Sequence, residues 1–303
     1  MPRPIWGDLN VAKGIGNGAG SLIYIAKDEN NGQVLAVKHV TRAAIEYIER
    51  SRVGDAEAKL GRKVYKSFFD QVRNEYAILK KFQDGGGSPG IVRVHELRTV
   101  RKNLRFQGYD LIMEYIEGVG LKEDNTAQMS QLLDYFRQAS QALVDFHHSG
   151  YVHADIKPAH IIITPGNLVK LIDFGQSCSI DGQRPRIQGT PEYMAPEQLK
   201  GDKVDFRTDV YGMGSSMYWG FTGRLNRPAL TGTSGGKGGM DFTVSFAGRS
   251  RSVRNDNPKV PKQLDHLIVA CCERRPEKRP QSIREVWEEI VDISKKGILP
   301  GSV

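Results

Sequence analysis

The stretch YVHADIKPAHIIITPGNLVKLIDFG, residues 151–175, is the feature that most constrains how this chain can fold. It contains two short apolar runs, at 161–163 and 168–172. Between them lies Pro165-Gly166-Asn167, a sequence that favours a tight turn. The pattern predicts a polar loop that is followed by a β-hairpin.

Three charged side chains of this stretch suit phosphoryl transfer. Asp155 and Lys157 lie in the loop before the hairpin, and Asp173 follows its second strand. Such a transfer needs a carboxylate that orients a hydroxyl nucleophile, a cation beside the transferring phosphate and a carboxylate that holds Mg²⁺. The stretch resembles the catalytic loop and metal-binding motif of eukaryotic-type protein kinases, H-R-D-L-K-x-x-N followed by D-F-G.

Two positions depart from this family pattern. Ala154 stands where the family has arginine, and His160 stands where it has a metal-binding asparagine. An arginine would link the catalytic aspartate to a phosphorylated activation segment, and alanine cannot form that link. Imidazole is a poorer ligand than an amide oxygen for Mg²⁺ and suits Mn²⁺ better.

Residues 13–24, KGIGNGAGSLIY, carry glycines at alternate positions. Without a Cβ, their backbone N–H groups can approach a phosphate chain closely, although glycine-rich turns between strands are common. Aligned with the kinase pattern G-x-G-x-x-G-x-V, the segment gives a nucleotide-binding set in which serine replaces the third glycine. That set is Gly16, Gly18, Ser21 and Ile23.

Two apolar segments, 21–28 and 33–40, flank Asn31-Gly32 and are predicted to form a β-hairpin. Ala36 and Lys38 of the second segment match the V-A-I-K strand of the kinase family, whose lysine binds the nucleotide phosphates. A lone strand lysine is ordinarily a surface residue, but its place after the glycine segment favours the functional interpretation.

Residues 41–82 are predicted to be helical, with an apolar stripe towards the C-terminal end. Glu75 in this segment resembles the kinase glutamate that pairs with the strand lysine, here Lys38. The separation of these two residues is longer than is usual in the family. Residues 41–66 are therefore interpreted as an inserted helical segment.

A further predicted strand, 109–116, resembles the segment that leads into the hinge of the kinase fold. The resemblance implies that Met113 is the gatekeeper beside the adenine pocket. It also implies that Glu114 to Ile116 offer backbone groups to the adenine edge. Three side chains would enclose the adenine ring: Ile23, Ala36 and Ile162.

Residues 189–197, GTPEYMAPE, resemble the end of a serine/threonine kinase activation segment. The resemblance implies that Thr190 forms hydrogen bonds around Asp155 and Lys157. Together with Lys157, this segment disfavours tyrosine as the phosphate acceptor.

Other positions are expected to be structural. Ser130 is expected to cap a helix that ends at Gly150. Asp209 resembles the family residue that accepts backbone N–H groups of the catalytic loop. Arg279 resembles the arginine that pairs with Glu197, and such a buried pair would be costly to break.

The composition is ordinary for a globular protein, with 39% hydrophobic and 26% charged residues. No apolar run approaches the ~18 residues of a membrane span, and the N-terminus lacks the apolar core of a signal peptide. Three cysteines without metal-ligand spacing favour a reduced compartment. An intracellular, cytoplasmic location is therefore expected.

Much of the net charge of +8 comes from a basic segment at residues 223–263. Such a segment could bind an acidic protein or nucleic acid. A solvated loop is the commoner explanation for a charge run, so nucleic acid is disfavoured as a partner.

Together, the motifs predict an α+β protein with the bilobal kinase fold, in which a small β-rich N-lobe precedes a large, mainly α-helical C-lobe. The expected divisions are an N-terminal tail (1–8), the N-lobe (9–115) and the C-lobe (116–303). The implied activity transfers the γ-phosphoryl group of ATP to a Ser or Thr hydroxyl of a protein. Mg²⁺ is the expected metal, with Mn²⁺ as the alternative.

The implied catalytic residues are Asp155, Lys157, Lys38 and Glu75, and the implied metal ligands are Asp173 and His160. The alternative is a pseudokinase that binds nucleotide or acts as a scaffold. The histidine at 160 supports that alternative, whereas the presence of the other charged residues opposes it.

Overall fold

The computed structural model describes residues 8–18, 20–53, 62–124, 126–180, 190–226 and 251–297. The chain divides into two compact units. Unit 1 comprises Met1–Gly86 and Val92–Glu117, and unit 2 comprises Gly87–Ile91 and Gly118–Val303. Several predicted features lie partly or wholly outside the described residues: the N-terminal tail, the middle of the 41–66 insertion, Gly189 and most of the basic segment 223–263.

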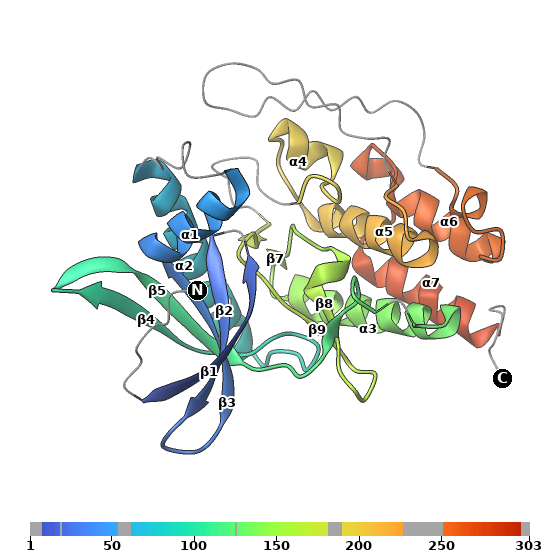
Figure 1. Cartoon of the computed structure of the whole chain (residues 1–303). Helices are drawn as coiled ribbons and strands as arrows, with labels where there is room; N and C mark the ends of the chain where they lie inside the picture. The colour runs from blue at the N-terminus through green and yellow to red at the C-terminus, as the bar shows by residue number, and fades with distance from the viewer. Residues whose placement is uncertain are drawn as a thin grey trace. The chain divides into compact units, whose positions relative to one another are not determined.

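Unit 1 is built on an antiparallel sheet of five strands in the order β1-β2-β3-β5-β4 (Figure 1). The strands are β1 (Leu9–Gly18), β2 (Ser21–Asp28), β3 (Val34–Thr41), β4 (Val94–Lys102) and β5 (Arg105–Glu114). The predicted hairpin around Asn31-Gly32 is confirmed, because β2 pairs with β3 and Gly32 has a φ of +74°.

Strand β5 starts earlier in the sequence than the apolar pattern predicted. Asn103 and Leu104 both have positive φ, 49° and 63°, as a two-residue type I′ turn requires. Leucine is uncommon in this conformation, so turn preferences did not mark the position. The strand expected at 109–116 therefore begins at Arg105 and ends at Glu114.

Two helices follow β3, α1 (Arg42–Val53) and α2 (Arg62–Asp84). Helix α1 lies in the segment predicted to be helical, 41–82, and α2 ends two residues beyond it. Buried side chains of α1, Ala44 and Ile48, pack against Leu22 and Tyr24 of β2. This apolar contact attaches the inserted helix to the sheet.

A chain of buried polar side chains fixes the start of α1. The ring of His39 donates from Nδ1 to the carboxylate of Asp110 at 2.5 Å, and its Nε2 lies 3.0 Å from Thr41 Oγ1. Thr41 is the N-cap of the helix, because its hydroxyl oxygen accepts the Ala44 N–H at 3.3 Å. The direction in which the chain leaves β3 is thus set by side chains of two strands.

Unit 2 is mainly helical and carries short strands. Its helices are α3 (Met129–His148), α4 (Pro196–Lys200), α5 (Phe206–Thr222), α6 (Lys262–Cys271) and α7 (Ile283–Lys295). Its strands are β6 (Val119–Gly120), β7 (Tyr151–Val152), β8 (Ile161–Ile163), β9 (Val169–Leu171) and β10 (Cys178–Ser179). The predicted hairpin is confirmed as β8 and β9, and α3 packs against α7 and α5 (Figure 1).

Helix α5 is buried on nearly all sides and supports the loop before β8. Two glycines let its backbone approach its neighbours. A Cβ on Gly214 would lie 2.5 Å from the Cβ of Cys271, and one on Gly212 would lie 3.1 Å from Ile156. The second contact brings α5 directly against the segment that carries Asp155.

The ends of α3 differ partly from expectation. Ser130 is not the N-cap, because the helix begins at Met129 and the cap position is Gln128. The Gln131 side chain accepts the N–H of Gln128 at 2.8 Å, which satisfies a backbone donor of the first turn. Gly150 does follow the end of the helix with a φ of +80°, as predicted.

The predicted α+β class is confirmed by the β-rich unit 1 and the mainly helical unit 2. Within the described ranges, no helix combines the length and apolar character that crossing a membrane requires.

Candidate active site

Strand register places the predicted nucleotide-binding side chains of unit 1 on one face of its sheet. Ile23 pairs with Lys38, and Ala36 pairs with Met113. Directly paired residues share a face, and so do residues two apart in a strand. Ser21 is two residues before Ile23, so all five side chains lie on the same face of the sheet.

The glycine segment forms β1 and its turn into β2. A Cβ on Gly16 would meet no atom within 4 Å, so its backbone borders open space. A Cβ on Gly18 would lie 2.8 Å from the Ser21 hydroxyl. That hydroxyl is buried and has no hydrogen-bond partner among the residues that the structure describes. Open backbone at Gly16 and a buried hydroxyl with this unused capacity fit the oxygens of a phosphate chain.

Lys38 and Glu75 form the predicted ion pair. The ammonium of Lys38 lies 2.7 Å from the Glu75 carboxylate, and the two side chains are 13% and 2% exposed. A lysine head tied at this point cannot move freely over the sheet. The pair therefore holds a positive charge on the face that Ser21 and Ile23 share.

In the segment that was expected to face adenine, one backbone N–H group already donates a hydrogen bond within the chain. The N–H of Glu114 donates to the carbonyl of Arg93 at 2.9 Å. The Glu114 carboxylate also accepts the N–H of Arg93 at 3.0 Å. These bonds fix the end of β5 against the residue before β4 and remove the Glu114 N–H from the expected adenine contacts.

In unit 2, Asp209 of α5 anchors the loop that carries Asp155, as predicted. Its carboxylate accepts the N–H of His153 at 2.8 Å and that of Ala154 at 2.7 Å. It also lies 2.8 Å from Nε2 of His147. Burial by itself would raise the pKa of Asp209, but the contacts with His147 and His153 outweigh it and lower the pKa.

His153 connects the backbone of Asp155 to the residue before Asp173 and has a defined tautomer. Its Nε2 lies 3.3 Å from the carbonyl of Ile172 and must donate, because a carbonyl oxygen only accepts. Its Nδ1 accepts the N–H of Asp155 at 3.3 Å, so the ring is neutral. Burial lowers the pKa of His153, in agreement with this assignment. No role for this histidine was predicted from the sequence.

Asp155, Lys157 and Thr190 are brought together as predicted. The N–H of Thr190 donates to Asp155 Oδ1 at 2.8 Å, and Lys157 Nζ donates to Thr190 Oγ1 at 2.6 Å. Lys157 Nζ also lies 3.4 Å from Asp155 Oδ2. One carboxylate oxygen is thus held by the backbone, and the other faces a cation.

His160 lies between Asp155 and Asp173. Its Nδ1 is 2.9 Å from the carbonyl oxygen of Asp155, so that nitrogen must carry the proton. Its Nε2 is 3.3 Å from Asp173 Oδ2. In the neutral ring, a nitrogen lone pair and a carboxylate oxygen therefore approach each other. An attached proton or a shared cation would make this contact favourable.

This arrangement fits a metal ion that is shared by the two side chains. Adjacent ligands of an octahedral ion with bonds of ~2.1 Å stand ~3 Å apart, close to the observed 3.3 Å between Nε2 and Oδ2. The described residues contain no cluster of three or more His, Cys, Asp or Glu side chains suited to a metal. Mg²⁺ characteristically uses one or two carboxylates and completes its shell with waters and phosphates.

Ala154 has a left-handed backbone with a φ of 60° and is buried. Its carbonyl accepts a hydrogen bond from Nε2 of Gln198 at 2.8 Å. Gln198 was not predicted, since only the folded chain brings it beside the loop. The small side chain at 154 leaves this position with no charge to offer an activation segment.

Arg279 and Glu197 form the predicted buried pair. Both guanidinium nitrogens Nη1 and Nη2 lie 2.8 Å from a carboxylate oxygen. Thr208 also donates to the same carboxylate, at 3.0 Å. The pair joins the start of α4 to the segment before α7.

Comparison with known protein families matches residues 9–291 to the protein kinase domain. The serine/threonine-protein kinase PknB of Mycobacterium leprae is 32% identical over 222 residues, 68% of this chain and 33% of the relative. A probable serine/threonine-protein kinase of Clostridium acetobutylicum is 31% identical over 192 residues, 60% of this chain and 28% of the relative.

A probable serine/threonine-protein kinase of Clostridium perfringens is 27% identical over 243 residues, 75% of this chain and 33% of the relative. The chain thus spans about a third of the length of the curated relatives it matches. With a kinase domain over nearly its whole length, the chain belongs to the eukaryotic-type protein kinase superfamily.

Proposed function

We propose that this chain is a serine/threonine protein kinase that transfers the γ-phosphoryl group of ATP to a protein hydroxyl. The observation that carries the proposal is the network around Asp155. Its carboxylate is oriented by the Thr190 N–H and lies beside the Lys157 ammonium. A hydroxyl nucleophile and a transferring phosphate require these two charges.

The proposed nucleotide site uses the face of the unit 1 sheet described above. Lys38, held by Glu75, would bind the α- and β-phosphates, and the glycine segment would approach them with its backbone. The phosphate-side residues are Gly16, Gly18, Ser21 and Lys38. The adenine-side residues of unit 1 are Ile23, Ala36, Met113, Glu114 (through its carbonyl group) and Ile116. Ile162 belongs to unit 2, and its place beside adenine stays a prediction from the sequence.

In the proposed reaction, Asp155 orients the acceptor hydroxyl. Its Oδ1 already accepts the Thr190 N–H, which leaves Oδ2 to accept the proton of the hydroxyl. Lys157, held by the Thr190 hydroxyl, would neutralise charge on the γ-phosphate. Mg²⁺, which Asp173 and His160 would hold, supplies further positive charge when bound.

Serine and threonine are proposed as acceptors because Lys157 and Thr190 match the serine/threonine kinase pattern. The hydrogen bond from Lys157 Nζ to Thr190 Oγ1, 2.6 Å long, supports this assignment. The pseudokinase alternative is favoured by one feature, the imidazole at position 160, because nitrogen is a poorer ligand than oxygen for Mg²⁺. In that alternative, His160 stabilises the loop and contributes no metal ligand.

The test is incorporation of the γ-phosphoryl group of ATP into a generic basic protein or into the chain itself. Wild-type protein is expected to label Ser or Thr residues well above the background set by Asp155→Ala. Phosphoamino-acid analysis identifies the acceptor, and nucleotide binding is measured in parallel. Wild-type protein that binds ATP but labels no better than Asp155→Ala across several substrates would establish the pseudokinase reading.

The histidine at 160 gives a second expected result. Asparagine offers Mg²⁺ a harder oxygen ligand, so His160→Asn is expected to raise the Mg²⁺/Mn²⁺ activity ratio about tenfold. Mn²⁺ affinity in the presence of a non-hydrolysable ATP analogue, measured by electron paramagnetic resonance, should fall in the same variant. This second readout needs no turnover.

His148→Asn is the matched control for this change. His148 is exposed and its Nε2 contacts Arg284, so neither the activity ratio nor the Mn²⁺ affinity should change. An unchanged ratio and unchanged Mn²⁺ affinity in His160→Asn would remove position 160 from the metal site. His160 would then be a structural residue that holds the Asp155 carbonyl.

A further inference from the structure

Unit 1 has a groove of about 390 Å³ where α1, the first half of α2 and β5 meet. No residue that we assign to the nucleotide lines it. The inserted segment supplies part of its wall, through Arg42 of α1 and the first turns of α2. The groove is therefore a feature separate from the proposed active site.

Three aromatic rings form the apolar part of the groove. Phe69 and Phe106 meet edge to face with ring centres 5.2 Å apart, and Phe106 meets Tyr109 in the same way at 5.2 Å. Phe69 is buried, whereas Phe106 is 36% exposed. The rings thus present an apolar surface that is only partly covered by the chain itself.

The rim of the groove is strongly basic. Arg42, Lys63, Lys66 and Arg73 are all exposed there, and Asp70 is the acidic residue that lines it. Lys66 lies 3.0 Å from Asp70 and offsets its charge. The Arg42 guanidinium lies over the Tyr65 ring at 5.7 Å, so this cation is positioned by an aromatic side chain.

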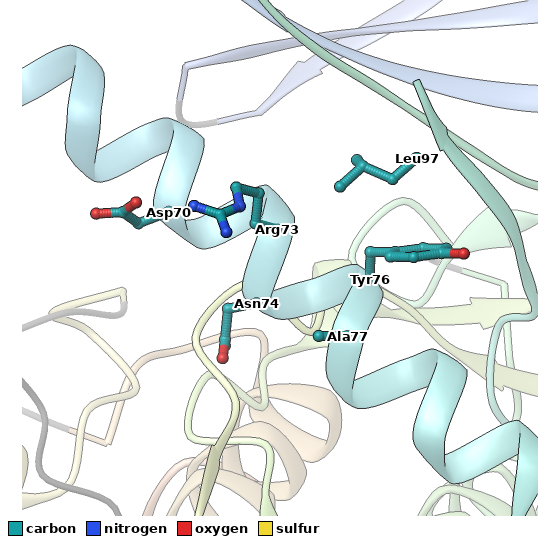
Figure 2. Close-up of a pocket in the computed structure, with 6 residues that line it drawn as sticks. All are labelled: Asp70, Arg73, Asn74, Tyr76, Ala77 and Leu97. Carbon is teal, nitrogen blue, oxygen red and sulfur yellow. The ribbon is translucent and has the colours of Figure 1, made fainter. Parts of the chain in front are cut away.

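The groove continues along α2. A second hollow of about 450 Å³ lies between α2 and β4, and it shares Asp70 and Arg73 with the first. In Figure 2, the Arg73 side chain lies between those of Asp70, which is also on α2, and Leu97, which is on β4. The two hollows together follow α2 from Lys63 to Ala77, about 20 Å at the rise of an α-helix. A surface of this length suits an extended segment better than a compact anion.

We propose that this groove is a docking site for an acidic peptide segment of another protein that carries a large apolar side chain. The aromatic rings would receive the apolar side chain, and the basic rim would pair with the carboxylates. Nucleic acid fits less well. Bases stack on exposed ring faces, whereas these rings pack edge to face against one another.

The test measures peptide binding to the full chain by fluorescence anisotropy, and it does not depend on kinase activity. The probe is the labelled peptide EDEFDEFED. Wild-type protein is expected to bind it, with an affinity that falls as ionic strength rises from about 0.05 M to about 0.5 M. Arg42→Glu with Lys63→Glu should weaken binding about tenfold or more, and Phe106→Ala about fivefold or more.

Matched controls separate the groove from general charge. Lys27→Glu with Lys203→Glu reverses two exposed charges outside the groove and should leave binding within about twofold of wild type. The peptide EDEGDEGED should bind much more weakly, because it lacks the apolar side chains. Circular dichroism checks that each variant is folded, and Phe106→Leu serves as a milder second variant, with a smaller loss expected.

Several results would overturn the proposal. They are no binding of EDEFDEFED by wild-type protein, equal binding by the groove and control variants, and equal binding of the two peptides. Oligo(dT) that binds more tightly than the peptide and depends on Phe106 would assign the groove to nucleic acid. A dimer in sedimentation that Phe106→Ala dissociates would assign it to a second copy of this chain.

Discussion

Lys38→Met is expected to lower kcat/KM for phosphoryl transfer at least about a thousandfold, or about 4 kcal/mol of transition-state stabilisation. The reason is that Lys38 supplies a positive charge fixed by Glu75 at 2.7 Å. Methionine keeps most of the side-chain volume but none of the charge. The measurement is steady-state phosphorylation with varied ATP and a fixed protein substrate.

Loss of the lysine also leaves the buried Glu75 carboxylate without the Lys38 ammonium. Breaking a buried pair costs about 3–5 kcal/mol of folding stability, so a loss of activity could follow from unfolding of unit 1. The double variant Lys38→Met with Glu75→Gln removes the buried charge as well. It should regain thermal stability while remaining inactive.

Glu75→Gln by itself completes this series. It keeps the ammonium but weakens the contact that holds it, so a smaller loss of activity than for Lys38→Met is expected. Double-variant activity near that of wild-type protein would contradict the assignment of Lys38 to the phosphates. A loss that tracks stability across all three variants would show that the pair is only structural.

The contacts that were predicted correctly belong to side chains with a fixed place in an ordered motif. Lys38 with Glu75 and Arg279 with Glu197 were each predicted as pairs, and each pair forms. In these cases, the residue type and the order along the chain restrict the partner strongly. The confirmed β8–β9 hairpin follows similarly from a turn sequence between apolar runs.

Contacts that depend on the position of individual atoms, and not only on residue type, could not be predicted from the sequence. A sequence does not say which ring nitrogen of His160 meets a carbonyl, yet this decides which nitrogen can bind a metal. The type I′ turn at Leu104 was missed because a neighbouring strand pair imposes a conformation that leucine disfavours. The docking groove had no local signal, since Phe69 and Phe106 come from segments far apart in the sequence.

Arg279→Met is expected to lower the free energy of unfolding of unit 2 by about 3–5 kcal/mol. All five N–H groups of this guanidinium are used within the fold. Two donate to Glu197, and the others donate to the carbonyls of Glu273, Arg207 and Arg274. Methionine would leave a buried carboxylate and three carbonyl groups without these donors.

Equilibrium urea unfolding measures the change, with the fluorescence of Trp219 and Trp287, which both lie in unit 2, as the signal. Arg275→Met is the matched control, because Arg275 and its partner Glu277 are 65% and 62% exposed. An exposed pair of this kind contributes about 0–1 kcal/mol. The control should therefore unfold close to the wild-type midpoint.

A second change separates the ion pair from the carbonyl contacts. Adding Glu197→Gln to Arg279→Met removes the unpaired buried charge and should recover at least about 1 kcal/mol, since neighbouring residues in one network couple by 0.5–3 kcal/mol. Recovery should be incomplete, because the three carbonyl groups still lack a donor. Equal midpoints for Arg279→Met and Arg275→Met would show that the buried contacts of Arg279 do not stabilise the link between α4 and the segment before α7.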